Sequence, residues 1–255
     1  RNLEIHTYHA FGTDILAKYR TYATNFNRNL DSSIDEVTQF KIIREIQESL
    51  NANDVLRASN TKDIVDTIQS AKSARLTGKD LQVIAEKNLE FADRLSAEVQ
   101  VIFKELVPRM KFLDAIDRVY NPLLLVLANH TTKRNLVKDI EPLANVLYLD
   151  LKKTILEESD KEKPSISPLS KWKNANFELD DNDHYRLKTY VANLKLKSLG
   201  NIMNLYDEKL AQEGLYDFAD MIEQAIEILK TDKGFRLTMS ERFQYILLDE
   251  FQDTN

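Results

Sequence analysis

The sequence predicts a mainly helical protein whose two ends contribute pieces of an α/β domain. Apolar residues recur at helical spacing through most of the interior, whereas strand-like apolar runs occur only at about 3–9 and 244–249. Of the 255 residues, 43% are hydrophobic and 30% are charged, which provides a core and a well-solvated surface for one or two domains. The longest apolar run, Leu123 to Ala128, is too short for a membrane span, so we expect no membrane contact.

Helix signals follow the predicted N-terminal strand. Ser33-Ile-Asp-Glu36 has the pattern of a capping box that opens a helix, and Asn121-Pro122 suits an N-cap and first turn. Further helices are expected at 61–75, 79–112, 135–158 and 183–213. One apolar stripe near the N-terminus is made by Ile15, Leu16, Tyr19, Tyr22, Ala23 and Phe26.

A charged, proline-containing loop is expected at 157–173, closed by Trp172, which should anchor it to the domain. Asp217 is the expected N-cap of a later helix, and Asp220 adds negative charge to its first turn. We expect this helix to support the sheet of the α/β piece and not to form a site. Its apolar stripe consists of Phe218, Met221, Ile222, Ala225, Ile226 and Leu229.

The last eleven residues, Tyr245 to Asn255, carry the strongest chemical signal. An apolar run leads directly into Asp249 and Glu250, which is typical of a buried parallel strand that delivers acids to the ligand-binding edge of a sheet. In a nucleotide hydrolase, Asp249 can hold a magnesium ion and Glu250 can orient or deprotonate the attacking water. By itself, an Asp-Glu pair more often marks an exposed turn after a strand.

The full string Asp249-Glu-Phe-Gln-Asp253 closely resembles the Walker-B motif of the UvrD/Rep/PcrA-type superfamily-1 DNA helicases. The resemblance implies a RecA-like α/β P-loop NTPase domain that uses ATP and Mg²⁺. It implies that Asp249 coordinates magnesium and that Glu250 is the catalytic base. It also implies that Gln252 couples the phosphate site to the DNA-binding surface and that Asp253 orders the loop.

Near the N-terminus, Thr7-Tyr8-His9-Ala10-Phe11 is similar to the family's Thr-Phe-His-Ser-Phe segment, which contacts single-stranded DNA. Thr7 and His9 can hydrogen-bond a phosphate, and Tyr8 can support a base or the loop. Tyr8 and Ala10 replace the family's Phe and Ser, and Ala10 removes one hydroxyl group. From the residue types alone, a Thr-x-His string on a strand more often reflects ordinary packing.

The net charge of −6 argues against a generally basic nucleic-acid-binding surface but allows a local groove. The best local candidate is 185–197, which contains Lys195, Lys197, two further cations and two tyrosines, and no acid. Such a surface can stack bases and neutralise phosphates. The alternative is an ordinary helix with apolar residues inside and cations on its solvated face.

The sequence contains no phosphate-binding P-loop, because no two of its five glycines lie five residues apart. The nearest string, Ser73 to Asp80, lacks the first glycine and has Asp80 where a magnesium-binding hydroxyl belongs. The first residue is Arg1, and the family's later motifs would lie beyond Asn255. We therefore expect an excised segment of a larger helicase that does not hydrolyse ATP by itself.

Cysteine is absent, which excludes disulfides and thiolate metal sites and is compatible with a cytoplasmic location. The four histidines show no metal-ligand spacing. Sequence alone therefore predicts no metal site apart from the magnesium ion implied at Asp249.

The resemblance implies a domain organisation for the whole chain. Residues 1–30 would belong to motor domain 1A, residues 31–213 would form the helical accessory subdomain 1B, and residues 214–255 would return to 1A. Ile68-Gln-Ser-Ala-Lys72 and Leu76 to Leu81 resemble the segment that enters this insertion.

The expected function is ATP-driven 3′-to-5′ movement on single-stranded DNA and unwinding at fork DNA. Two other interpretations remain open. In the first, the parent protein is a helicase–nuclease of the recombination type. In the second, the chain is a non-catalytic helical module that binds DNA or protein and retains a degenerate motor remnant.

Overall fold

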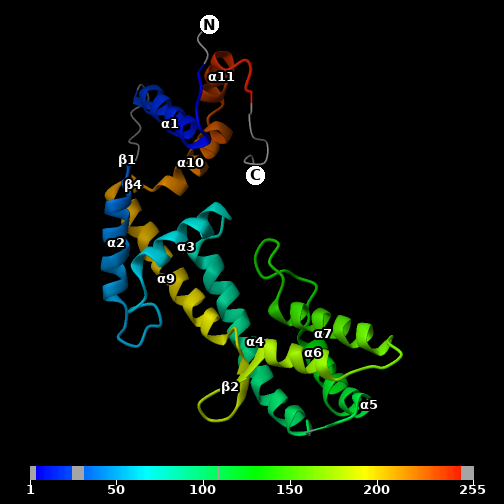
Figure 1. Ribbon diagram of the computed structural model, residues 1–255. Helices are drawn as coiled ribbons and strands as arrows, with labels where there is room; N and C mark the ends of the chain where they lie inside the picture. Colours follow the sequence, from blue (N-terminus) through cyan, green and yellow to red (C-terminus); the bar gives the residue numbers. More distant parts are fainter. Residues whose placement is uncertain (1–3, 25–31, 108, 248–255) are drawn as a thin grey trace. The chain divides into compact units, whose positions relative to one another are not determined.

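The computed structural model in Figure 1 describes residues 4–24, 32–107 and 109–247. With 70% helix and 4% strand, it confirms the mainly helical fold class. The chain forms two compact units. Unit 1 comprises residues 1–45, 61–75 and 205–255, and unit 2 comprises residues 46–60 and 76–204. The predicted assignment of 1A and 1B boundaries stays a prediction beside this division.

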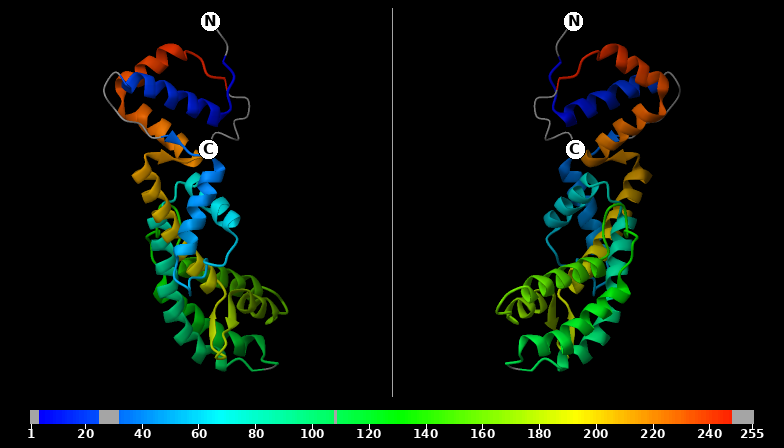
Figure 2. Two further views of the ribbon diagram at one scale, coloured as in Figure 1. Left: turned by 90° about the vertical axis from the view of Figure 1, so that its left-hand side faces the viewer. Right: turned by 90° about the vertical axis from the view of Figure 1, so that its right-hand side faces the viewer.

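Unit 1 is built around a small helical core. Figure 2 shows α1, α10 and α11 side by side. The core residues come from these helices and from the strand that precedes α10: Ile15, Leu16, Tyr19, Ala23, Tyr216, Met221, Ala225, Phe235 and Met239. The helices of this unit are α1 (Tyr8–Thr24), α3 (Thr61–Ser73), α10 (Phe218–Thr231) and α11 (Lys233–Arg242).

A short parallel ladder joins two distant segments of unit 1. Strands β1 (Ser32–Ser33) and β4 (Leu215–Tyr216) pair with Ser32 opposite Leu215 and Ser33 opposite Tyr216. Helices α2 (Glu36–Ser49) and α9 (Tyr190–Glu213) each contain a point at which the chain passes from one unit to the other, and two further crossings follow Asn60 and Arg75.

Unit 2 has a larger core of apolar and aromatic side chains, which include Leu95, Leu123, Leu151 and Trp172. Strands β2 (Phe177–Leu179) and β3 (Tyr185–Leu187) form an antiparallel hairpin. The helices of unit 2 are α4 (Gly78–Lys104), α5 (Phe112–Ala115), the π-helix η1 (Ile116–Tyr120), α6 (Asn121–His130), α7 (Leu143–Ser159) and α8 (Ser167–Asn176). Among the described residues, no helix is both long and apolar enough to cross a membrane.

The predicted strands at the two ends of the chain are not present in the described residues. Tyr8 and His9 are the first residues of α1, and neither 4–7 nor 243–247 forms a strand. Thr7 Oγ1 accepts a hydrogen bond from the Ala10 amide at 3.2 Å, which favours a helix start over an extended chain. A strand also needs a backbone partner, and the described part of the chain offers none to either segment.

Two predicted helix starts are wrong. Ser33 belongs to β1, and the amide of Thr38 in α2 donates to Asp35 Oδ1 at 2.7 Å, so Asp35 takes the role predicted for Ser33. Asn121 is not an N-cap, because α5, the π-helix and α6 run on continuously with Tyr120 already in a helical conformation. Pro122 follows the point at which the π-helix passes into α6, where the Asn121 amide donates to the Ile116 carbonyl and the hydrogen-bond register changes, and such an interruption accommodates a proline.

Three other predicted helices are shorter than expected. The helix expected over 79–112 ends at Lys104, and the next helix, α5, begins only at Phe112. The helix expected over 135–158 begins only at Leu143, because a residue that precedes proline, here Glu141, avoids helical dihedrals. The helix expected over 183–213 begins at Tyr190, since Asp180 Oδ1 accepts from the amides of Asn182 and His184 at 2.8 and 2.9 Å. This turn closes the β2–β3 hairpin.

The loop expected over 157–173 is also shorter, because α7 extends to Ser159 and α8 begins at Ser167. Trp172 lies in α8, is 5% exposed and has its ring 6.0 Å from that of Phe177. It therefore anchors its segment to the core of unit 2, as the sequence predicts.

Candidate functional site

The segment with the predicted DNA contacts meets the end of α11. Arg242 Nη2 donates to Glu4 Oε1 at 2.7 Å, although the two residues are 238 positions apart in the sequence. The Arg242 guanidinium, and then the His6 ring, hold the pKa of Glu4 below its usual value. Arg242 ends the helix that leads to the predicted Walker-B strand. The two segments that carry the helicase-like motifs therefore share unit 1.

An aromatic and cationic cluster reinforces this meeting of α1 and α11. The ring of Phe243 lies edge-on to Phe11 at a centroid distance of 5.2 Å. Lys18 Nζ and the Arg242 guanidinium lie 5.4 and 5.6 Å from the centroid of the Phe243 ring. Burial, followed by the nearby Arg242 charge, lowers the pKa of Lys18. This cluster holds α1 against the residue that follows α11.

A shallow pocket of about 350 Å³ lies beside this cluster. The cations at its rim already have acidic partners, since Lys18 pairs with Asp14 and Arg242 pairs with Glu4. The pocket therefore offers no excess of positive charge for an anionic ligand. Its lining consists of Lys18, Thr21, Tyr22, Phe235, Thr238, Met239 and Arg242.

Glu4, His6 and Asp14 form a cluster that the sequence spacing did not reveal. One ligand atom from each lies within 4.8 Å of the other two, close enough to surround a metal ion. However, His6 and Arg242 hydrogen-bond to Glu4, and Lys18 pairs with Asp14. Both carboxylates are thus engaged by side chains of the protein.

The structure places the predicted DNA-contact residues at the start of α1. Thr7 is exposed, and its hydroxyl oxygen caps the first turn by accepting from the Ala10 amide. Tyr8 and His9 are the first two residues of the helix. Backbone N–H groups of a first helical turn favour anions.

The predicted catalytic and metal-binding residues Asp249, Glu250 and Gln252 lie outside the described residues, as does Asp253. The chain that leads to them is exposed, with Tyr245 at 85% and Leu247 at 92%. Their roles in catalysis and magnesium binding remain predictions.

The predicted basic surface at 185–197 is divided between β3 and α9. Two of its cations have acidic partners: Arg186 lies 3.0 Å from Glu178, and Lys197 Nζ lies 3.0 Å from Glu86 Oε1. Lys195 is exposed and has no ion pair within the described ranges. The stretch is therefore not a single face of free cations, and its role in DNA binding remains a prediction.

The string Ser73 to Asp80, which superficially resembles a P-loop, has a structural explanation. Thr77 and Asp80 form a capping box at the start of α4, with Asp80 Oδ2 accepting from the Thr77 amide at 2.8 Å. A Cβ atom at Gly78 would lie 2.5 Å from the carbonyl oxygen of Gly200, so this close approach to α9 requires glycine. Helix capping and helix packing account for these residues without a phosphate.

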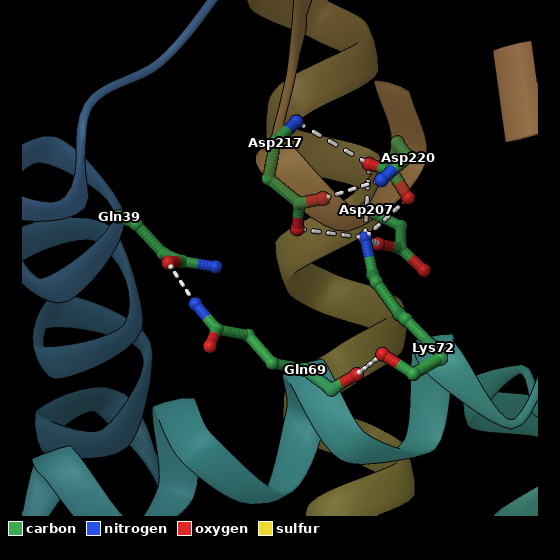
Figure 3. Close-up of polar contacts among 7 residues, drawn as sticks. Gln39, Gln69, Lys72, Asp207, Asp217 and Asp220 are labelled. Carbon is green, nitrogen blue, oxygen red and sulfur yellow. Dashed lines mark hydrogen bonds and ion pairs between the residues drawn. The ribbon is translucent and has the colours of Figure 1, made fainter. Parts of the chain in front are cut away.

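Sequence reasoning missed a buried ionic cluster in unit 1, which Figure 3 shows in close-up. Lys72, near the end of α3, has a 7% exposed side chain, and its ammonium nitrogen contacts three carboxylates. It lies 2.9 Å from Asp207 of α9, 2.9 Å from Asp217 and 2.8 Å from Asp220. The cluster joins α3 and α9 to the first turn of α10.

Burial and charge act in opposite directions on this cluster. Burial disfavours the Lys72 cation, but Asp217, Asp220 and Asp207 together raise the pKa of Lys72. Burial and the neighbouring Asp217 charge raise the pKa of Asp220 to about 6, against the attraction of Lys72. Despite burial, Lys72 and hydrogen bonds from Asp220 hold the pKa of Asp217 below its usual value. The positive charge of Lys72 thus offsets the negative charge of two closely spaced carboxyl groups, those of Asp217 and Asp220.

Two further contacts enclose the cluster. Lys72 Nζ lies 5.1 Å from the ring centroid of Tyr206, which is fully buried. Gln69 Nε2 donates to Gln39 Oε1 at 3.0 Å, which ties α3 to α2 (Figure 3). The sequence does contain a signal for this cluster. Lys72 continues the buried stripe of α3, which consists of Ile64, Val65, Ile68 and Ala71, and a lysine in such a position requires an acidic partner.

Curated relatives of the chain are DNA helicases and components of helicase/nucleases. A probable DNA helicase II homolog of Mycoplasma pneumoniae is 26% identical over 181 residues, which are 66% of this chain and 24% of that protein. An ATP-dependent helicase/nuclease subunit from Streptococcus pneumoniae is 32% identical over 78 residues, which are 30% of this chain and 6% of that protein. The chain spans at most 24% of the length of these relatives.

No solved structure matches the chain. The family model of the UvrD/REP helicase N-terminal domain matches residues 1–150 and 127–255, which together span the whole sequence. The chain therefore belongs to the UvrD/REP helicase family, as the resemblance of its two terminal motifs predicts.

Proposed function

We propose that the chain is a segment of an ATP-dependent DNA helicase or translocase with 3′-to-5′ polarity, acting in the cytoplasm. The observation that carries the proposal is the hydrogen bond between Arg242 and Glu4. It brings the segment that leads to the Walker-B-like string beside the segment that leads to Thr7 and His9, as expected when two distant pieces form one motor domain. Residues 31–213 would then be an insertion of the 1B type.

Asp249 would hold Mg²⁺, and Glu250 would act as the base for the water that attacks ATP. The magnesium ion would supply charge neutralisation at the phosphates. Gln252 would couple the phosphate site to the DNA-binding surface, and Asp253 would order the loop. The family membership of the chain supports these roles.

Single-stranded and fork DNA are the proposed partners. Thr7 and His9 would bind phosphates at the first turn of α1, with Tyr8 supporting a base. Lys195 and Lys197 would add a weaker contact. The exposed position of Lys195 supports this role more than that of Lys197, because Lys197 is paired with Glu86.

A recombination-type helicase–nuclease is a second candidate for the parent protein. The similarity over 78 residues to an ATP-dependent helicase/nuclease subunit favours it. Sequencing of the parent gene downstream of residue 255 distinguishes the two candidates, since a nuclease motif of Asp, Glu and Lys is expected only in the second.

The decisive experiment replaces the proposed catalytic base in the intact protein. We expect Glu250→Gln to abolish ATP hydrolysis while ATP binding persists, because the amide keeps the shape of the side chain but cannot accept a proton. Glu241→Gln, at an exposed position of α11, is the matched control and should hydrolyse ATP normally. Near-normal turnover by Glu250→Gln would contradict the assignment.

DNA binding is tested separately by fluorescence anisotropy of this chain with labelled single-stranded and fork DNA at two salt concentrations. Binding that weakens with salt and is stronger for the fork would support a DNA-engaging surface. Lys195→Ala should then weaken binding more than Lys197→Ala. Absence of binding at low salt would favour the non-catalytic or protein-binding interpretation of the insertion.

A further inference from the structure

The ionic cluster of Lys72 lies at both connections between unit 1 and the main part of unit 2. Lys72 precedes Arg75, after which the chain passes into unit 2, and Asp207 follows Asn204, after which the chain returns. The Arg75 amide donates to the Lys72 carbonyl at 2.7 Å, and Arg75 has a φ of 57°, so the chain turns sharply after the cluster. Within unit 1, one ammonium group therefore joins the segment that precedes the first of these points to the segment that follows the second.

The same ammonium group fixes the first turn of α10. Asp217 is the N-cap of this helix, and Asp220 is its reciprocal partner in the capping box. The Asp220 amide donates to Asp217 Oδ1 at 2.9 Å independently of Lys72. Loss of the lysine would leave α10 capped but would remove the ionic contacts that join its first turn to α3 and α9.

Helix α10 in turn positions the predicted motor segments. Thr13 of α1 donates to Met221 Sδ of α10 at 2.9 Å, and α1 begins at the predicted DNA contacts. Helix α11 follows α10 directly, because Asp232 is both the C-cap of the first and the N-cap of the second. A displacement of the start of α10 would therefore reach both motif-bearing segments.

We propose that Lys72 is a positioning residue, whose ammonium group holds the start of α10, and with it the predicted motor segments, to the two helices at which the chain leaves and re-enters unit 1. The proposal rests on the proposed motor function for its consequence, but its structural part can be judged without that function. Replacement of the lysine by an apolar residue should destabilise this arrangement, because three carboxylates would then face one another without a cation.

The first test is hydrogen exchange on the full chain with Lys72→Met. Amides of 205–221 should exchange about a hundred-fold faster or more, whereas those of 95–103 in the core of unit 2 should be unchanged. Lys209→Met is the matched control, because Lys209 also lies on α9 but its ion pair with Glu45 is at the surface. Equal exchange in the two variants would overturn the proposal. If Lys72→Met does not fold, Lys72→Gln, which keeps a hydrogen-bond donor, is judged by the same criterion.

The second test uses the intact protein. Lys72→Met should lower the kcat of DNA-stimulated ATP hydrolysis by about three-fold or more with little change in the KM for ATP, and Lys72→Arg should restore it. Faster exchange with an unchanged kcat would reduce Lys72 to a stabilising residue and overturn the positioning role. If the unmutated intact protein hydrolyses no ATP, the proposed function fails, while the exchange experiment still decides the structural part.

Discussion

Unit 1 and unit 2 are both built from helices, but they bury charged side chains differently. In unit 2, the buried Glu158 pairs with a lysine, Lys161, whose side chain is 58% exposed. The core of unit 2 consists of apolar and aromatic groups such as Leu95 and Trp172, and its Lys197–Glu86 ion pair is half-exposed on both sides. In unit 1, Lys72 and Asp217 are 7% and 1% exposed and lie 2.9 Å apart.

The two units therefore depend on different interactions for their stability. Apolar burial adds up over many contacts, so the stability of unit 2 is spread over its core residues. Unit 1 has an apolar core as well, but its buried carboxylates depend in addition on one partner, Lys72. We therefore expect the stability of unit 1 to respond to the loss of this one lysine and, through Asp220, to pH near 6.

The largest expected effect is that of Lys72→Met on the stability of unit 1. Because it leaves buried carboxylates without a cation, we expect a loss of about 3–5 kcal/mol in the free energy of unfolding of unit 1. Native-state hydrogen exchange of α10 measures this loss. Fluorescence of Trp172, the chain's one tryptophan, follows unit 2 and should show no comparable shift in its urea midpoint. An equal loss of stability in both units would contradict the proposed difference between them.

Leu95→Ala should destabilise the other unit. Leu95 is fully buried in the core of unit 2, so its truncation should cost about 2–5 kcal/mol, measured by Trp172 fluorescence in urea. Leu113→Ala, at a position that is 71% exposed, is the control and should change stability by less than about 0.5 kcal/mol. Equal effects of the two substitutions would contradict the described core.

The pH dependence of unit 1 should be smaller but specific. The pKa of Asp220 is raised to about 6, above its ordinary value of 3.8, so its contribution is present at low pH and is lost as pH rises through about 6. Acidification from pH 7 to 5 should therefore stabilise unit 1 through Asp220 by about 1 kcal/mol. The pKa of Asp217 is lowered, so its contribution to the stability of unit 1 is lost only at more acidic pH.

Asp220→Asn serves as the internal comparison for this titration, because it removes the Asp220 carboxyl group and leaves every other titratable side chain in place. Hydrogen exchange of α10 at pH 5 and 7, corrected for intrinsic exchange rates, measures the difference. A pH response that is the same in the variant and the unmutated chain would assign it to other groups.

The smallest effect is expected for Lys197→Ala. Its ion pair with Glu86 is half-exposed and screened by water, so removal should cost no more than about 1 kcal/mol of unit 2 stability. The urea midpoint of Trp172 fluorescence measures this cost. A loss as large as that of Lys72→Met would remove the distinction between buried and surface charge.

Local signals in the sequence predicted several parts of the fold correctly. Asp217 caps α10, and Trp172 anchors its segment, because capping and apolar burial depend on residue type and short spacing. The strands expected at the two ends are absent from the described residues, because pairing depends on a partner backbone that a local pattern does not specify. The helix expected over 183–213 begins only at Tyr190. Hydrogen bonds to the Asp180 side chain stabilise a turn in the segment where apolar spacing had predicted helix.

The candidate site was predicted less completely than the fold. Family membership followed from the terminal motifs, but the contact between Glu4 and Arg242 joins residues 238 positions apart and has no local signal. Asp217 and Asp220 were predicted as capping residues only. Their ionic role depends on Lys72, which reaches them from a distant helix, so only the three-dimensional arrangement reveals it.

The most direct test of the account is the rate of ATP hydrolysis by the intact protein with and without single-stranded DNA. We expect magnesium-dependent hydrolysis that DNA stimulates and that Glu250→Gln abolishes. Two results would contradict the assignment of this chain to a DNA motor. One is a rate of ATP hydrolysis that does not change when DNA is added, and the other is no hydrolysis by an intact protein that carries a P-loop.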